Sequence, residues 1–417
     1  MTIDINVTSE IGPLKSVVVH TPGLEIENMT PHTAAELLYD DILNYELAAG
    51  EHREFKQVLD RVCRTIELRE LLVEVLEDNR RVAEALVDEL CWLFDVPEVR
   101  DELLALPAAD LGRQLIEGTA KKPISLEKYL DPSRYAIPPL SNAFFTRDAA
   151  MAVNNRMIIG SMAYRARTAE ALLLKAVFKY HPGISHQGFY FDGTDTDSDE
   201  VSIEGGDFLV VREDLALIGY SERTSAAGID KLMRAIAARG PINNFIVVEI
   251  PKTRATIHLD MIFTMIDHDK CVVYPPLITG LNRCRAFHCS FAGGPQAKIV
   301  EHRDVLGALA SVGIDLAPVS CGGSEPYMQE REQWASGANF FAFGPGQILG
   351  FRHNRHTVDA LDRAGFGVID APDLIAGRRD IGPEERVVVT VGGAELSRGG
   401  GGCRCMTMPL TRDRVAL

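Results

Sequence analysis

The stretch SRGGGGCRCMTMPL, residues 397–410, lies near the end of this 417-residue chain and decides how the rest is interpreted. Four consecutive glycines are unfavourable within a helix or a strand, because glycine loses more backbone freedom on folding than any other residue. Such a run is kept where the chain bends sharply or approaches a ligand closely. It leads to Cys405 beside the positive charge of Arg404, which favours a reactive thiolate. A flexible tail with incidental cysteines accounts for the run equally well, so the remaining sequence must decide.

Composition excludes several classes of protein. The net charge is −16, and no basic stripe is available to meet the phosphates of a nucleic acid. No apolar run reaches the roughly 18 residues that a membrane-spanning helix needs. Residues 1–6 lack the features of a secretion signal, and the eight cysteines lack the spacing of a small disulfide-rich domain. We therefore expect a cytoplasmic protein that contacts neither nucleic acid nor membrane.

The first third of the chain is predicted to be mostly helical. Lys15–His20 is rich in β-branched residues and is typical of a strand. From Ala34 onward, apolar residues recur at helical intervals. This spacing continues through a long stretch in which Pro97 and Pro107 separate successive helices. We expect an inserted helical subdomain at about 58–130, uninterrupted by strands and serving as a scaffold or lid.

After two consecutive prolines at 138–139, short β-type segments alternate with single helices. The expected strands are Met151–Ile159, Phe208–Val211, Leu215–Tyr220, Asn244–Ile250, Ile262–Ile266, Cys271–Tyr274, Phe340–Phe343, Gln347–Phe351 and Val387–Val391. The expected helices are Arg167–Tyr180, Ala226–Arg239, Arg303–Val312 and Thr357–Ala364. The recurring order of strand, strand, helix and strand differs from the strict alternation of a doubly wound sheet. It favours small mixed sheets repeated around a centre.

Two clusters in this region carry acidic residues. Asn142 and Asp148 follow the prolines, where a solvated turn is the simpler interpretation. Glu204 and Asp207 flank two glycines, which allow a close approach of the backbone and direct both carboxylates into limited space. A hairpin or bulge before the next strand explains the second cluster equally well.

A third cluster, His258-Leu259-Asp260, combines an imidazole with a carboxylate. If this segment is a strand, His258 and Asp260 share one face. Two such groups in apolar surroundings are costly unless they are paired or functional. A metal site would need a third ligand at an identifiable spacing, and none is found, so no metal is expected.

Taken together, these groups suit one kind of substrate. Cys405 supplies a potential nucleophile and His258 a proton shuttle. Acids at 148, 204 and 260 suit a planar cation, and Arg167 and Arg223 suit a carboxylate through bidentate contacts. Free L-arginine carries a guanidinium at one end and a carboxylate at the other. Surface arginines that have no functional contact are nevertheless common.

With these residues in this order, the chain resembles the arginine deiminases, members of the guanidine-modifying superfamily. The resemblance rests on motifs that occur in the family's order at similar intervals: Phe145-Thr146-Arg147-Asp148, Glu204-Gly205-Gly206-Asp207, Ser221-Glu222-Arg223-Thr224, His258-Leu259-Asp260, Arg331-Glu332-Gln333-Trp334 and Arg404-Cys405-Met406. It implies a single catalytic domain over residues 1–417. The implied fold is a fivefold pseudosymmetric α/β propeller of ββαβ modules, with a helical bundle inserted.

The resemblance also implies a reaction and a role for each residue. The family hydrolyses L-arginine to L-citrulline and ammonia in arginine catabolism, without metal or organic cofactor. Cys405 would attack the guanidinium carbon, and Asp148 and Asp260 would bind its nitrogens. His258 would protonate the leaving ammonia and then activate the water that cleaves an S-alkylthiouronium intermediate. Glu204 would orient His258.

The remaining assignments concern the rest of the substrate and the alternatives. The residues expected to contact it are Asn142, Phe145, Arg167, Arg223, Gly399 and Arg404, with Arg165 as the alternative to Arg167. A homodimer or higher oligomer is implied. Cys403, so near the nucleophile, raises the alternative of a disulfide with Cys405. Other readings are a hydrolase or amidinotransferase acting on agmatine or a methylated arginine, or a binding protein on the same scaffold.

Overall fold

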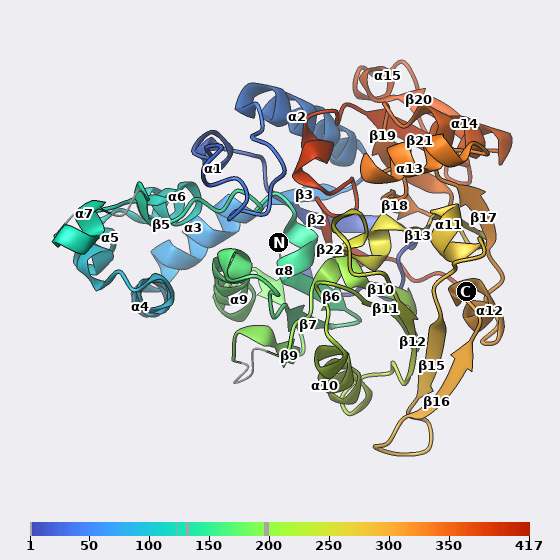
Figure 1. Ribbon diagram of the computed structural model, residues 1–417, viewed down its shortest axis with the longest axis horizontal. Coiled ribbons are helices and arrows are strands. Elements are labelled where there is room, and N and C mark those ends of the chain that lie inside the picture. Colours follow the sequence, from blue (N-terminus) through green and yellow to red (C-terminus); the bar gives the residue numbers. More distant parts are fainter. Residues whose placement is uncertain (1, 123, 131–132, 196–199) are drawn as a thin grey trace.

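The computed structural model describes residues 2–122, 124–130, 133–195 and 200–417, and mixed sheets dominate it (Figure 1). Five of these sheets share one pairing pattern, in which two antiparallel strands are joined by a third strand parallel to one of them. The five three-strand sets are β6 (Ala150–Val153), β7 (Arg156–Ile159) and β9 (Phe189–Asp192); β10 (Phe208–Arg212), β11 (Leu215–Tyr220) and β12 (Asn244–Glu249); β13 (Phe263–Met265), β14 (Lys270–Val273) and β17 (Ala317–Ser320); β18 (Phe341–Gly344), β19 (Gln347–Phe351) and β21 (Val387–Val391); and β22 (Met408–Arg412), β2 (Leu14–Val19) and β3 (Arg64–Glu67).

Helices connect the two parallel strands of each set, as parallel pairing requires a long crossover. The crossover helices are α9 (Thr168–Tyr180), α10 (Ala226–Ala237), α11 (Pro275–Ile278) with α12 (Val305–Ala310), α14 (Arg355–Arg363) with α15 (Ala371–Ile375), and α1 (Leu24–Glu27) with α2 (Tyr45–Val62). The recurring unit of strand, strand, helix and strand expected from the sequence is therefore present.

Five additional pairings lie outside this pattern. β15 (Ala286–Ser290) and β16 (Lys298–His302) extend the second sheet into a protruding hairpin, and β20 (Gly367–Asp370) pairs with β21 (Figure 1). Short pairs join β1 (Ile3–Asp4) to β8 (Ile184–Ser185) and β4 (Thr119–Ala120) to β5 (Tyr135–Ile137).

The helical segment projects to one side of the sheets (Figure 1). It contains α3 (Leu68–Asp78), α4 (Arg80–Phe94), α5 (Arg100–Ala105), α6 (Ala108–Glu117) and α7 (Leu126–Leu130). The expectation of an uninterrupted helical stretch is wrong, because β3 and β4 fall within 58–130. Helical spacing alone could not reveal β3, whose one buried residue, Ile66, continues the apolar pattern on both sides. Residue 123 of the predicted subdomain lies outside the described residues.

Two further sequence expectations need correction. The segment from Ala34 forms consecutive turns instead of a helix, and Leu38 has a positive φ of 69°. The predicted strand Met151–Ile159 is a hairpin of two strands, because Asn154 adopts φ 50° at the turn, a conformation that asparagine tolerates. By contrast, the boundaries of Leu215–Tyr220, Gln347–Phe351 and Val387–Val391 are confirmed.

Within the described residues, no helix is long and apolar enough to cross a membrane.

The last strand, β22, completes a sheet with β2 and holds the loop that carries Cys405, here called the thiol loop. β22 pairs antiparallel with β2, and its residues Met408 and Leu410 are fully buried in the largest apolar cluster. Because β22 begins three residues after Cys405, the pairing that joins the two ends of the chain also anchors the loop.

Leu410→Ala is expected to lower the free energy of unfolding by about 2–5 kcal/mol, since it removes a buried side chain and leaves a cavity. Urea unfolding monitored by circular dichroism measures this change. Leu281→Ala is the matched control, because Leu281 is 98% exposed, and its effect should stay within about 0.5 kcal/mol. Equal effects of both substitutions would contradict the anchoring role of β22.

Candidate active site

Loops from several sheets meet at a small pocket that contains Cys405. The pocket encloses about 20 Å³, which is room for about one water molecule. A substrate as large as arginine therefore has to displace part of its wall. Its lining residues are Leu38, Asn142, Phe145, Asp148, Arg167, Arg223, Arg254, Ile257, His258, Gly399, Gly400, Gly401 and Cys405.

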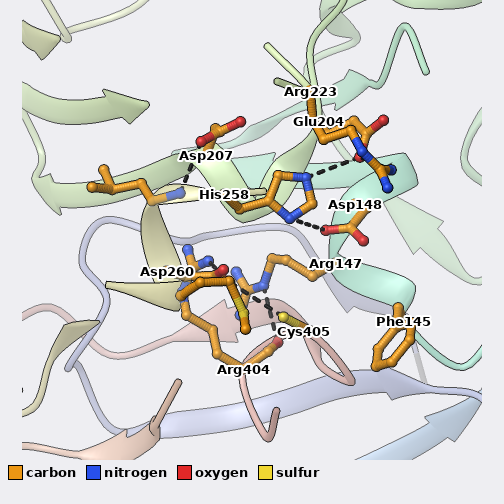
Figure 2. Close-up of polar contacts among 12 residues, drawn as sticks. Phe145, Arg147, Asp148, Glu204, Asp207, Arg223, His258, Asp260, Arg404 and Cys405 are labelled. Atoms are coloured by element: carbon orange, nitrogen blue, oxygen red, sulfur yellow. Dashed lines mark hydrogen bonds and ion pairs between the residues drawn. The ribbon is translucent and has the colours of Figure 1, made fainter. Parts of the chain in front are cut away.

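Cys405 is buried, with its sulfur facing His258 and Asp148 in Figure 2. Its Sγ lies 3.6 Å from Asp260 Oδ2 and 3.2 Å from Asn339 Nδ2. Burial and the negative charges of Asp260 and Asp148 raise the thiol pKa well above its ordinary value. These surroundings therefore oppose ionisation of the thiol, and an additional positive charge nearby would favour it.

His258 lies between two carboxylates. Its Nε2 is 2.9 Å from Glu204 Oε2, and its Nδ1 is 3.8 Å from Asp148 Oδ1. Burial lowers the pKa of His258, but Asp148 and Glu204 outweigh burial and raise this pKa to about 9. The pKa of Glu204 falls to about 2 because Arg223 and His258 outweigh the opposing effect of burial. At neutral pH the pair is an imidazolium and a carboxylate.

Gly205 and Gly206 make the contact between His258 and Glu204 possible. A Cβ on Gly206 would lie 2.4 Å from His258 Nδ1, and one on Gly205 would lie 1.9 Å from the carbonyl oxygen of Arg147. Neither position has room for a side chain. Next to them, Asp207 Oδ1 accepts the backbone N–H of Leu259 at 2.9 Å, which holds the segment that carries His258.

Asp148 and Asp260 share an unusual arrangement. One oxygen of each accepts a guanidinium N–H: Arg167 Nη1 lies 2.6 Å from Asp148 Oδ2, and Arg404 Nη1 lies 2.8 Å from Asp260 Oδ2. The other oxygen, Oδ1 in both cases, is buried without a hydrogen-bond partner among the described residues. Buried acceptors normally have partners, so this pair is suited to an incoming cationic donor.

The Arg404 side chain departs from its predicted contact with substrate. It is 1% exposed, does not line the pocket, and extends from the thiol loop toward Asp260 in Figure 2. Its remaining nitrogens donate to Glu10, at 2.9 and 3.1 Å, and to the carbonyl oxygen of Phe208 at 2.8 Å. Arg404 thus fixes both the loop and Asp260.

The two predicted carboxylate-binding arginines differ in how their nitrogens are occupied. Arg167 donates to Glu170 through Nε and Nη2 and to Asp148 through Nη1. Arg223 donates one bond to Glu204 at 3.3 Å, its guanidinium carbon stacks 4.6 Å from the ring of Tyr164, and its buried Nε has no partner among the described residues. Arg223 therefore has more free donor capacity than Arg167.

The glycine run packs closely over the pocket. Gly400 has φ 87°, which favours glycine. A Cβ on Gly401 would lie 2.5 Å from the ring of Phe145, and one on Gly402 would lie 2.8 Å from Asn339. Gly399 also contacts Phe145. The glycines are thus explained by close packing beside the thiol.

All eight cysteines are free in the structure, Cys403 and Cys405 included. Cys403 is fully buried in the same apolar cluster as Cys405, and burial alone raises its pKa.

The site contains a set of possible metal ligands that the sequence did not reveal. Asp148, Glu204 and His258 present ligand atoms within 4.8 Å of one another. However, the guanidinium groups of Arg167 and Arg223 already contact the two carboxylates. A divalent cation would meet two fixed positive charges at close range, which favours a monovalent guanidinium there.

Two local expectations about the catalytic segments are wrong. His258 and Asp260 do not lie on a strand: His258 is extended and precedes a 3-10 helix at Leu259–Met261. Asp148 lies on the short helix α8 (Thr146–Ala149) instead of in a turn. Period-two alternation could not distinguish a strand from a turn of 3-10 helix over three residues.

Several residues at the site were missed by sequence reasoning. They are Glu10, Arg147, Glu170, Arg254 and Asn339. Arg147 belongs to a motif already noted, and its backbone N–H donates to the Cys405 carbonyl oxygen at 3.1 Å. Glu170 lies on the predicted helix, three residues after Arg167. Glu10, Arg254 and Asn339 come from segments without a recognisable pattern, and only the fold brings them to the site.

Solved structures with a similar fold include two enzymes. An amidinotransferase of saxitoxin biosynthesis from Microseira wollei aligns with a TM-score of 0.53 and 14% identity, covering 99% of this chain and 98% of that one. The N-terminal domain of a cyanobacterial arginine dihydrolase, bound to product, aligns with a TM-score of 0.53 and 12% identity, covering 95% and 97%. At these identities the likeness shows the α/β fold alone.

Sequence comparisons identify the family. The family model described as arginine deiminase matches residues 35–412. The arginine deiminase of Lactococcus lactis subsp. cremoris (strain MG1363) is 33% identical over 435 residues, covering 99% of this chain and all of that protein. That of Mycoplasma capricolum subsp. capricolum is 30% identical over 418 residues, covering 98% and 97%. Since both matches extend over nearly the whole length, this chain belongs to the arginine deiminase family.

Proposed function

We propose that this protein hydrolyses free L-arginine to L-citrulline and ammonia, with Cys405 as the nucleophile. The observation that carries the proposal is that Asp148 and Asp260, whose charges act on the Cys405 thiol, each keep one buried oxygen, Oδ1, without a hydrogen-bond partner among the described residues. A guanidinium presents coplanar N–H groups that match carboxylates. Bound there, it satisfies both oxygens and places its central carbon near the thiol.

Substrate binding prepares the nucleophile. The guanidinium brings a positive charge to a thiol whose ionisation Asp260 and Asp148 oppose. This charge lowers the thiol pKa, and the thiol proton leaves to solvent. The thiolate then attacks the guanidinium carbon and forms a tetrahedral adduct.

His258 carries the proton transfers that follow. As an imidazolium held by Glu204, it donates its proton to the departing nitrogen, which leaves as ammonia. An S-alkylthiouronium on Cys405 remains. Neutral His258 then accepts a proton from water, whose oxygen attacks the same carbon. Collapse of this second adduct expels the thiolate and yields citrulline, and the surplus proton converts ammonia to ammonium.

The amino-acid end of the substrate is assigned to the mouth of the pocket. Arg223, whose Nε has no partner among the described residues, receives the carboxylate. Asn142, whose Nδ2 donates to the Leu37 carbonyl oxygen, offers its Oδ1 to the ammonium. Arg167 can join the carboxylate only by exchanging part of its contact with Glu170. Agmatine lacks the carboxylate, so these arginines favour arginine over it.

The proposal also covers the fold, the cellular location and the oligomeric state. The five matching strand sets support a fivefold pseudosymmetric α/β propeller as a single domain, with the helices of 58–130 as its insertion. The free cysteines support a cytoplasmic location. The exposed edge strand β16, with Ile299 62% and Val300 41% exposed, supports a homodimer or higher oligomer. Sedimentation as a monomer at micromolar concentration would contradict the last point.

The direct test of the reaction is to assay citrulline and ammonia after incubation with L-arginine. Cys405→Ala should reduce the rate by at least about 10³-fold, since it removes the nucleophile. Cys403→Ala, a change of the same kind two residues away, should retain most of the activity. Absence of citrulline from the wild type would refute the function, and an active Cys405→Ala protein would refute the mechanism.

Arg223→Ala should weaken arginine binding about 10- to 100-fold, because a hydrogen-bonded charge contact is lost. Calorimetry on a Cys405→Ala background measures binding without turnover. Agmatine binding should change far less, and Arg212→Ala, on strand β10 with its own partner Asp214, should alter neither. Equal losses for arginine and agmatine would remove Arg223 from carboxylate binding.

Glu204→Gln should lower the pKa of His258 from about 9, because removing a negative charge destabilises the imidazolium. The proton that His258 donates is thereby lost at lower pH, and the alkaline limb of kcat should move in the same direction. Nuclear magnetic resonance of the imidazole nitrogens follows this titration. Glu213→Gln, on the surface, should leave it unchanged. An unaltered His258 titration in Glu204→Gln would contradict the role of Glu204 in orienting His258 and raising its pKa.

A further inference from the structure

Asn339 connects the two segments that carry the proposed catalytic groups. It lies in the turn between α13 (Pro326–Trp334) and β18 and is 1% exposed. Its Oδ1 accepts the backbone N–H groups of Arg404 at 2.9 Å and Cys405 at 3.2 Å. Its Nδ2 lies 3.2 Å from the carbonyl oxygen of Asp260 and 3.2 Å from Cys405 Sγ.

These partners determine which way the amide faces. The two backbone N–H groups can only donate, so the atom beside them must be the acceptor oxygen. The amide NH₂ is then directed at the sulfur and at the Asp260 carbonyl, with one hydrogen for each. The orientation therefore follows from the network and places an N–H donor at the reacting atom.

The loop sequence is adapted to this side chain. A Cβ on Gly402 would lie 2.8 Å from both Cβ and Oδ1 of Asn339. Gly402 also provides a backbone hydrogen bond that favours the ionised sulfur. The glycine that ends the run thus lets Asn339 approach the thiol.

We propose that Asn339 is a catalytic residue whose Nδ2–H donates the hydrogen bond that stabilises the Cys405 thiolate, while its Oδ1 fixes the loop that presents the sulfur. This inference rests on the proposed function. Burial and the charges of Asp260 and Asp148 oppose ionisation of Cys405. A neutral N–H donor can stabilise the thiolate without giving up its own proton. A hydrogen bond to an ion is also stronger than one to the neutral thiol, and the contact gains most when the thiolate forms.

The test compares Asn339→Asp with the wild type in the full-length protein. Aspartate keeps the size and the oxygen that accepts from residues 404 and 405, but replaces the donor with a negative charge. The pH dependence of Cys405 alkylation by iodoacetamide, resolved by peptide mass spectrometry, reports the thiolate directly. We expect alkylation at a given pH to slow at least about 10-fold. The kcat for arginine should fall about 10- to 100-fold, and KM by comparison should change little.

Two further variants keep the proposal falsifiable. Asn339→Ser avoids the new charge and is too short to reach the sulfur, and it should slow alkylation in the same direction. Asn354→Asp is the matched control, because Asn354 is equally buried and donates to the Ala335 carbonyl oxygen away from the thiol. Its alkylation profile should equal that of the wild type.

An unchanged alkylation profile in Asn339→Asp or Asn339→Ser would overturn the proposal, as would an equal shift in Asn354→Asp. Alkylation does not require arginine turnover. If the wild type made no citrulline, the proposed function would fail, yet the alkylation profiles would still decide the role of Asn339.

Discussion

A charge buried away from water must be matched by an opposite charge, and this constraint organises the site. Arg167 is held by Asp148 and Glu170, Arg404 by Glu10 and Asp260, and His258 by Glu204. Pairing of this kind is costly to break, because a buried charge left alone is strongly destabilising. The network holds His258, Asp148 and Asp260, and it leaves one oxygen of each aspartate without a hydrogen-bond partner among the described residues. Those two oxygens create the demand for a cationic substrate.

The thiol loop depends on the same network and on the sheet behind it. Arg404 anchors the loop through ion pairs, Asn339 through backbone contacts, and β22 through its pairing with β2. The glycine run contributes in a different way, because it lets the backbone of the loop lie against Phe145 and Asn339. The glycine run, whose sequence suggested flexibility, is therefore closely packed. Because it has no side chains, its backbone can lie next to the pocket.

Much of the fold could be predicted from the sequence, and so could several of the residues that the structure brings together at the pocket, for different reasons. Buried strands such as Val387–Val391 have a continuous apolar pattern, so their boundaries were predictable. β3 and the 3-10 helix after His258 were not, because their backbone is decided by tertiary pairing and not by local spacing. Motifs located Cys405, His258 and the acids. Contacts from Glu10 and Asn339 depend on long-range packing and leave no local signal, whereas Glu170 contacts Arg167 only three residues away.

The central claim is that the Cys405 sulfur bonds to the guanidinium carbon of arginine. It is tested most directly by rapid acid quench of the enzyme during turnover, followed by peptide mass spectrometry. The account predicts a peptide containing Cys405 that carries arginine less ammonia, both in the wild type and in His258→Gly, in which formation and breakdown of the intermediate are both slowed. Citrulline formation with no adduct on Cys405 at any quench time, in either protein, would contradict the account.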